Sequence, residues 1–282
     1  MLDGAVLKTF RPLIVTPCFG EKLCMNYVLG IINFQREAIA AGMPFDVYFR
    51  PGDSLVTRVR NDCVAHFLAN PPYTHLFWID ADIGFSPLAA FRLLLSGHDV
   101  GVYPLKREDW PSEGVPAGTT RRKWEELYAR YTVNTGCEGE QGVDLVIDAD
   151  GFMQVREAPT GFMCIKRQVF DRLIARYPQL RYVPDWPEGS YPKGGVHYRF
   201  FDVMVDPETQ RYLSEDYGFC RLWEATGGTI HVDANSNLTH LGERVYRGDF
   251  GATLRAAAAH AIGAPKGQQI RVFGLENLKP NP

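Results

Sequence analysis

A short apolar run that ends abruptly in two carboxylates constrains this chain more than any other feature. Residues 76–79 read Leu-Phe-Trp-Ile, and Asp80-Ala-Asp82 follows directly. An apolar run without alternation is typical of a parallel strand that helices cover on both faces. Such a strand ends at the carboxyl edge of its sheet, where open α/β folds bind their ligands. We therefore expect the two acids at a binding site.

Strand and helix patterns alternate through the first hundred residues. Strands are expected at 12–16, 45–49, 76–79 and 99–103, with helices at 23–41, 55–67 and 87–95 between them. Repeated βαβ units predict a mostly parallel sheet with helices on both faces. The expected fold class is therefore α/β, a Rossmann-like single domain.

The pattern changes after residue 104. Asp148-Ala-Asp150-Gly151 lies between two strand-like runs, so a hairpin is expected there and the second acid pair is expected to form its turn. The remaining expected elements are a helix at 122–130, hairpin strands at 143–147 and 152–157, a helix at 167–177, a strand at 198–205, a helix at 215–226, a strand at 229–232 and a helix at 252–262.

The composition excludes several classes of protein. The 282 residues are 45% hydrophobic and 22% charged with a net charge of -3, as in an ordinary globular domain. Basic residues are scattered, so no nucleic-acid partner is expected. No apolar run approaches the roughly 18–20 residues that span a bilayer, and the amino terminus lacks a signal-peptide pattern. The six cysteines form no CxxC pair, which favours reduced thiols and a cytoplasmic location.

The acid pair after residue 79 is expected to hold a cation. Two carboxylates at a sheet edge cost free energy unless a charge compensates them, and a hard divalent cation is the usual compensation. We expect Asp82 as a direct ligand of Mn²⁺ or Mg²⁺, and Asp80 as a contact to ribose, sugar or metal-bound water. The alternative is that the acids cap the next helix, but Ser86 and Pro87 already suit its first positions.

Three other groups carry polar side chains that suit a binding or catalytic site. Arg58 and Asn61 lie three residues apart on one expected helix, where they suit a phosphate, a ribose or a base edge; a surface ion pair of Arg58 with Asp62 is the alternative. His240 is a candidate ligand for Mn²⁺, although a lone histidine at a strand end is more often structural.

Ser214-Glu215-Asp216 opens another expected helix. A first-turn acid gains roughly 0.3–1 kcal/mol from the helix dipole, and Ser214 suits the N-cap. Capping explains part of this motif, but it does not explain two adjacent acids. A general base is the more specific interpretation of this motif.

In this order the motifs resemble the metal-dependent GT-A glycosyltransferases. That family has a nucleotide-binding strand, an Asp-x-Asp after a later strand, a glycine loop, an x-Glu-Asp motif at a helix start and a histidine on the carboxyl side. The matching stretches are Ile14-Val-Thr16-Pro17, Asp80-Ala-Asp82, Thr160-Gly161-Phe162-Met163, Ser214-Glu215-Asp216 and His240. Arg58-Val-Arg-Asn61 and the phrase that begins at Gly161 are also similar to the mannan-polymerase branch and related bacterial and viral transferases.

The resemblance covers residues 12–242 and implies a GT-A domain over 1–262. Residues 1–103 would bind the nucleotide, 104–242 would bind the acceptor, and 243–282 would form a carboxyl-terminal extension. It implies transfer of a sugar, such as a hexose, from a nucleotide-diphosphate sugar to a hydroxyl of a glycan, glycolipid or polysaccharide, with Mn²⁺ or Mg²⁺. The aromatic-rich stretch 182–198 is expected on the acceptor side.

The resemblance also implies roles for individual residues. Asp82 and His240 would hold the cation against the diphosphate, and Asp80 would touch the ribose, the donor sugar or the metal site. Asp216, or else Glu215, would deprotonate the acceptor in an inverting reaction; in a retaining reaction Asp216 would orient it. The donor would be contacted by Thr16, Pro17 and Cys18 at the nucleoside, by Arg58 and Asn61 nearby, and by the backbone at Gly161.

Three rivals remain open. A haloacid-dehalogenase-type phosphatase also uses Asp-x-Asp, but its motif follows the first strand and has a different continuation. A nucleotidyltransferase shares the fold and the cation but needs a Gly-rich basic first loop, which residues 16–22 match poorly. A carbohydrate-binding module of the same fold without turnover would bind sugar without needing Asp216.

Overall fold

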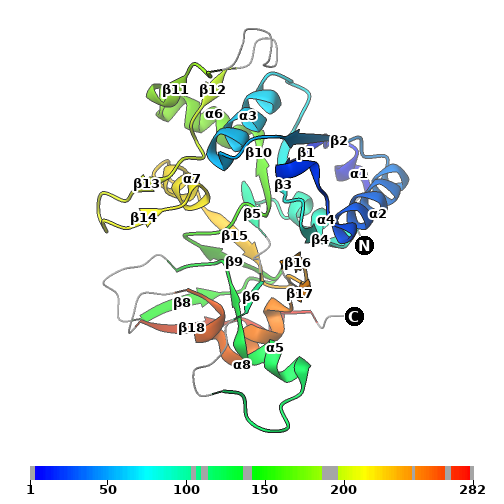
Figure 1. Ribbon diagram of the computed structural model, residues 1–282, viewed down its shortest axis with the longest axis vertical. Helices are drawn as coiled ribbons and strands as arrows, with labels where there is room; N and C mark the ends of the chain where they lie inside the picture. The colour runs from blue at the N-terminus through cyan, green and yellow to red at the C-terminus, as the bar shows by residue number, and fades with distance from the viewer. Residues whose placement is uncertain are drawn as a thin grey trace.

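A seven-stranded sheet forms the centre of the protein. The computed structural model describes residues 4–102, 106–108, 114–135, 142–185, 196–242, 245–263 and 268–279 (Figure 1). Within them the sheet has the order β2-β1-β3-β10-β5-β15-β9. Five strands run one way, and β9 and β10 run the other. The sheet strands are β1 (Pro12–Cys18), β2 (Asp46–Pro51), β3 (His75–Ile79), β5 (Val100–Val102), β9 (Phe152–Val155), β10 (Phe162–Lys166) and β15 (Ile230–Asp233).

Helices cover both faces of this sheet, which confirms the predicted α/β class with a mostly parallel sheet. The longer helices are α2 (Met25–Ala41), α3 (Val56–Leu68), α4 (Pro87–Leu95), α5 (Arg121–Tyr128), α6 (Arg167–Arg176), α7 (Glu215–Glu224) and α8 (Phe250–Ala261). The short elements are α1 (Gly4–Leu7), η1 (Phe19–Glu21), β4 (Ile83–Gly84), β6 (Lys106–Glu108), β7 (Ala129–Tyr131), β8 (Gly142–Val146), η2 (Pro178–Leu180), β11 (Arg181–Tyr182), β12 (His197–Tyr198), β13 (Met204–Val205), β14 (Tyr212–Leu213), β16 (Thr239–Leu241), β17 (Val245–Arg247), β18 (Gln269–Phe273) and η3 (Leu275–Asn277).

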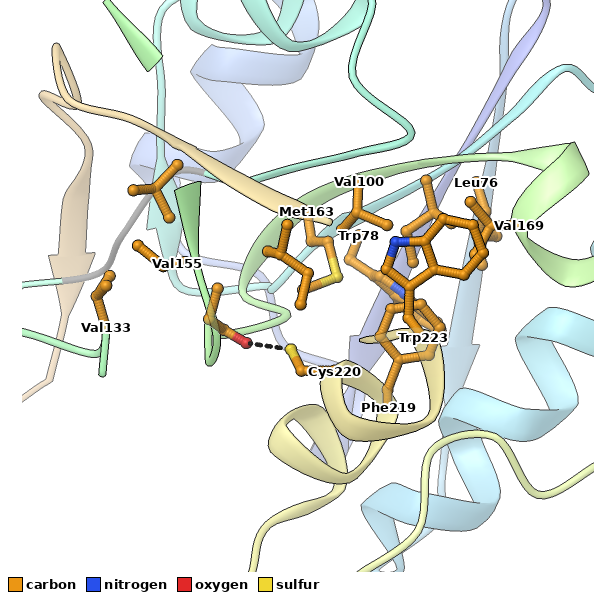
Figure 2. Close-up of a cluster of buried hydrophobic side chains, with 14 of the residues drawn as sticks. Leu76, Trp78, Val100, Val133, Val155, Met163, Val169, Phe219, Cys220 and Trp223 are labelled. Atoms are coloured by element: carbon orange, nitrogen blue, oxygen red, sulfur yellow. Dashed lines mark hydrogen bonds between the residues drawn. The ribbon is translucent and has the colours of Figure 1, made fainter. Parts of the chain in front are cut away.

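Strand β3 shows why residues 76–79 are all apolar. Leu76 and Trp78 belong to one hydrophobic cluster, with side chains of α3, α6, α7 and α8. Phe77 and Ile79 belong to a second cluster, with side chains of α1, α2 and α4. Figure 2 shows part of the first cluster, in which side chains of β3 and α7 come together and the thiol of Cys220 donates to the Ala158 carbonyl at 3.6 Å. Because both faces are buried, no polar residue interrupts the strand before Asp80.

Three expected elements differ from the structure. Strand β10 lies beside β3, where the sequence pattern places only a glycine loop. The expected strand 198–205 is two short strands, β12 and β13, because Phe200 and Phe201 between them are both buried and Asn61 binds the backbone of Phe201. The expected hairpin is reduced to one bridge between Ile147 and Met153, since β8 pairs with β18 and β9 pairs with β15.

Other local predictions are confirmed. Helix α2 ends at Gly42, which has the left-handed φ of 69°, and Ser86 caps α4 with its hydroxyl accepting from the Ala89 N–H. The carboxylate of Asp148 accepts from the backbone N–H groups of Asp150 and Phe152, both at 2.9 Å, so the second acid pair does form a turn.

The carboxyl-terminal part packs into the same core as the sheet. Phe250 and Leu254 of α8 and Leu278 belong to the cluster that also contains residues of β15. The division into a nucleotide-binding half, an acceptor-binding half and an extension stays a prediction. In the described ranges, no helix combines the length and the apolar character needed to cross a membrane.

A buried network of ion pairs holds α7 in place. Glu157 is fully buried, and both of its oxygens bind Arg211, at 2.7 and 3.0 Å. Arg221 of α7 contacts Glu157 at 2.6 Å, and also reaches Asp206 at 3.0 Å and Glu224 at 2.9 Å. A buried carboxylate is tolerated here because two guanidinium groups compensate it.

Glu157→Gln is expected to lower the free energy of unfolding by about 2–3 kcal/mol, because it leaves two arginines without their buried counter-charge. Urea denaturation measures this. Glu126→Gln is the control, since Glu126 forms an i,i+4 pair with an exposed Arg122 and its loss should cost no more than about 0.5 kcal/mol. Equal unfolding midpoints for the two variants would contradict the role given to Glu157.

Candidate functional site

A cleft of about 600 Å³ opens at the carboxyl ends of β1, β2 and β3. This is the edge of the sheet at which α/β folds bind ligands. Figure 1 shows these three strands next to one another, with α3 and α2 on either side. The lining includes Pro17, Cys18, Asp80 and Asp82, which the sequence analysis singles out, and further residues that it does not: Phe19, Lys22, Leu23, Cys24, Arg50, Asp53, Ser54, Val56, Val59, Arg60, Ala81 and Leu241.

Backbone pairing fixes the two acids that follow β3. The Asp80 N–H donates to the carbonyl of Gly161 at 2.9 Å, so the predicted glycine lies directly beside the first acid. The carbonyl of Asp82 accepts from the Leu241 N–H, also at 2.9 Å. Asp82 therefore lies between the main sheet and the short strand β16.

Strand β16 brings His240 to Asp82. In the small sheet β17-β16-β4, His240 pairs with Ile83. Its Nε2 atom lies 3.3 Å from Oδ2 of Asp82, and the Asp82 side chain remains 46% exposed. The predicted metal ligands, far apart in the sequence, thus face each other at the cleft.

Gly84 allows this close approach. A Cβ atom added at Gly84 would lie 2.7 Å from the Cβ of Asn26 in α2, and would also overlap the hydroxyl of Thr239. Only glycine fits between α2 and β16 without displacing one of them.

The residues present fit a cation that arrives with its substrate. Among the described residues, no group of three or more His, Cys, Asp and Glu side chains is arranged to hold a metal ion. Asp82 and His240 supply one oxygen and one nitrogen, which leaves the remaining positions to phosphate and water, as is common for Mg²⁺ and its relatives. An imidazole ligand beside a carboxylate suits Mn²⁺ better than Mg²⁺.

Arg60 is a site residue that the sequence analysis misses. Its side chain is only 6% exposed, yet it lines the cleft. Its Nε donates to Glu215 at 3.1 Å, and its terminal nitrogens lie 3.4–3.5 Å from the carboxylate of Asp80. The guanidinium also lies over the Trp78 ring, 5.0 Å from its centroid. Arg60 therefore connects the acids after β3 with the acids that open α7.

The two acids that open α7 have different surroundings. Glu215 is paired with Arg60, whereas Asp216 accepts from the Tyr217 N–H at 2.9 Å and contacts the hydroxyl of Ser214. Ser214 stands at the N-cap, but its hydroxyl caps no backbone N–H. Burial raises the pKa of Asp216 above its ordinary value, and the negative charge of Glu215 raises it further. Neighbouring acids whose different environments shift their pKa values apart are typical of acid–base sites.

Four predicted donor-binding residues, Thr16, Arg58, Asn61 and Gly161, are not among the residues that line the cleft. The hydroxyl of Thr16 is buried against the Tyr27 hydroxyl at 2.6 Å. The amide of Asn61 is buried and exchanges two hydrogen bonds with the Phe201 backbone, at 2.9 and 3.0 Å. Arg58 lines a separate cavity of about 410 Å³.

The alternative interpretation of Arg58, an ion pair, is confirmed with Asp53 as the partner in place of Asp62. Arg58 binds Asp53 through two hydrogen bonds, at 2.6 and 2.8 Å, which lower the pKa of that carboxyl. Asp62 pairs instead with Arg50 at 3.0 Å. The separate cavity that Arg58 lines also contains Tyr182 of the aromatic-rich stretch 182–198, but residues 186–195 of that stretch lie outside the described residues.

Comparisons with known proteins find distant structural likenesses. No protein-family model matches the chain, and no curated protein sequence matches it. Among solved structures it resembles protein A197 from STIV, with 14% identity and a TM-score of 0.41 over 83% of this chain and 86% of that one. It also resembles 4-diphosphocytidyl-2C-methyl-D-erythritol synthase from Anaerococcus prevotii, with 7% identity and a TM-score of 0.32 over 64% and 81% of the two chains. At such low TM-scores, neither likeness supports an argument about function.

Substitutions of the two acids that open α7 are expected to change stability in opposite directions. When the pKa of an aspartate is raised in the folded state, its ionisation destabilises the folded protein. The Asp216→Asn variant should therefore unfold at a higher temperature than the unaltered protein at neutral pH. This difference in unfolding temperature should vanish as the pH falls below about 3.9, the pKa of an aspartate in the unfolded state. Glu215→Gln should instead lower the unfolding temperature, because it removes the partner of a buried arginine. Calorimetry at several pH values tests both variants. If both shift the unfolding temperature in the same direction at neutral pH, the different surroundings of Glu215 and Asp216 are contradicted.

Proposed function

We propose that this protein is a glycosyltransferase that moves a sugar from a nucleoside diphosphate sugar to a hydroxyl acceptor with the help of Mn²⁺ or Mg²⁺. The observation that carries the proposal is that separate motifs meet through side-chain contacts at the end of β3, where Asp80 and Asp82 line the cleft. Asp82 meets His240 at 3.3 Å, and Arg60 joins Asp80 to Glu215. This transfer requires ligands for a cation and a basic carboxylate near one another.

The donor is expected to lie along the carboxyl ends of β1, β2 and β3. Pro17, Cys18 and the exposed ring of Phe19 offer an apolar surface for a nucleoside at one side of the cleft. Asp82 and His240 would hold Mn²⁺ or Mg²⁺ against the diphosphate. When bound, this cation neutralises the charge that develops on the leaving diphosphate.

Asp216 is proposed as the general base. In a direct displacement, its carboxylate takes the proton of the acceptor hydroxyl while the acceptor oxygen bonds to the anomeric carbon. The bond from that carbon to the diphosphate oxygen breaks, and its electron pair leaves with the nucleoside diphosphate. The raised pKa of Asp216 favours this role, since a more basic carboxylate accepts a proton more readily. Inversion at the anomeric carbon, seen by NMR of the product, separates this route from a retaining one in which Asp216 only orients the acceptor.

The rival functions differ in what they release. A thermal-shift screen of nucleoside diphosphates with and without Mn²⁺ selects the donor, and incubation with the matching nucleotide sugars follows. The proposal expects a nucleoside diphosphate and a glycosylated acceptor. A phosphatase would release inorganic phosphate, a nucleotidyltransferase would form or consume inorganic diphosphate, and a binding module would release nothing.

Asp82→Ala is expected to abolish the Mn²⁺-dependent part of nucleotide-sugar binding, because it removes the carboxylate ligand that faces His240. Isothermal titration calorimetry with and without Mn²⁺ measures this. Asp171→Ala, an exposed aspartate on α6, is the control and should bind as the unaltered protein does. Unchanged Mn²⁺-dependent affinity in Asp82→Ala would refute the metal site.

Asp216→Asn is expected to keep donor binding and to lower glycosyl transfer by a factor of about 10² or more, since the amide cannot accept the acceptor proton. Single-turnover transfer and calorimetric donor affinity, measured on the same preparation, separate the two effects. Full transfer activity in this variant would remove Asp216 from the base role.

A further inference from the structure

Arg60 lies between the acids that follow β3 and the acids that open α7. It reaches this position from the middle turn of α3, whose neighbouring residues Val59 and Cys63 point into the core. The Trp78 ring packs against its guanidinium, and the side chain is almost fully buried. A guanidinium keeps its charge in such a place, where an ammonium group would be easier to neutralise.

The hydrogen bonds of Arg60 are shared unequally between its partners. The bond to Glu215 is the shorter, at 3.1 Å, and the contacts to Asp80 are 3.4–3.5 Å. Asp216 stands next to Glu215 but receives no hydrogen bond from Arg60 among those that the structure describes. The guanidinium therefore neutralises Glu215 directly and acts on Asp216 only through space.

Among the described residues, Glu215 and Arg60 are charged groups that act on the Asp216 carboxyl. Glu215 adjoins it in the chain, Arg60 acts on it through space, and Tyr217 and Cys220 of α7 lie close to it with raised pKa values of their own. Tyr217 and Cys220 are neutral at physiological pH, so the charges that set the basicity of Asp216 are those of Glu215 and Arg60.

We propose that Arg60 is a positioning residue that gives the two adjacent acids of α7 different tasks: it holds Glu215 as a fixed counter-charge and leaves Asp216 as the carboxylate that takes the acceptor proton. This inference rests on the glycosyltransferase function proposed above and deepens it. Arg60 takes no part in bond formation. It determines which carboxylate is basic and lowers the pKa of Asp216, because an unpaired Glu215 would make ionisation of Asp216 harder.

The test is the titration of the Asp216 carboxyl in the ligand-free protein, followed by carbon-detected NMR, together with the acid limb of the pH–rate profile. Arg60→Met removes the positive charge and leaves Glu215 unpaired, so the titration midpoint and the acid limb should both move up by about one pH unit. Glu215→Gln removes the neighbouring negative charge and should move both down. The double variant removes one charge of each sign and should lie between the two single variants.

Two further variants separate this role from a structural one. Arg60→Lys keeps the charge without the planar fork, so the midpoint should stay closer to that of the unaltered protein than in Arg60→Met. Arg92→Met is the matched control, because Arg92 also pairs with a buried aspartate, Asp233, and lies over an aromatic ring, that of Phe152, away from the cleft. It should lower stability without moving the Asp216 midpoint.

The outcomes distinguish this inference from the proposed function. If the protein transfers no sugar, the proposed function fails, while the NMR midpoints still decide the role of Arg60. If the protein transfers sugar but neither Arg60→Met nor Glu215→Gln moves the Asp216 midpoint, the inference is wrong and the function stands. If Arg60→Met does not fold, Glu215→Gln and Arg60→Lys decide the question, and an upward shift or no shift in Glu215→Gln overturns it.

Discussion

Negative charge gathered at one edge of the sheet must be compensated, and this constraint governs the site. Asp80, Asp82, Glu215 and Asp216 are carried there by β3 and α7, and β3 could not present its acids anywhere else because its apolar residues fill both faces of the sheet. The protein itself supplies Arg60 between two of these acids. Asp82 faces an imidazole instead, and in the proposed function these two side chains would share a cation with the ligand.

Much of the fold follows from local patterns in the sequence. The apolar run of β3 and the end of α2 at Gly42 appear where the sequence predicts them, because burial on both faces and left-handed backbone at a helix end act over a few residues. The long-range pairings do not follow in this way. Strand β10 is a short apolar segment whose place beside β3 depends on partners more than eighty residues away.

The residues of the candidate site likewise divide into those that local sequence patterns predict and those that depend on long-range contacts. Asp80, Asp82 and Asp216 can be selected from the sequence because acids at a strand end and at a helix start are unusual and chemically specific. Helix α3 also carries Arg58, and nothing in the local sequence indicates which of the two arginines is buried. Arg60 therefore cannot be selected in the same way. In this helix Arg58 pairs with Asp53 and lines a separate cavity, and Asn61 binds the backbone of Phe201.

Ion pairs hold α7 near both of its ends. Arg60 binds it at its first residue, and Glu157 and Asp206 bind Arg221 close to its last turn. A helix fastened at two points neither slides along the sheet nor tilts about one end without breaking several charge contacts together. Under the proposed function, differences in selectivity would therefore arise from the segments around the cleft and not from the position of this helix.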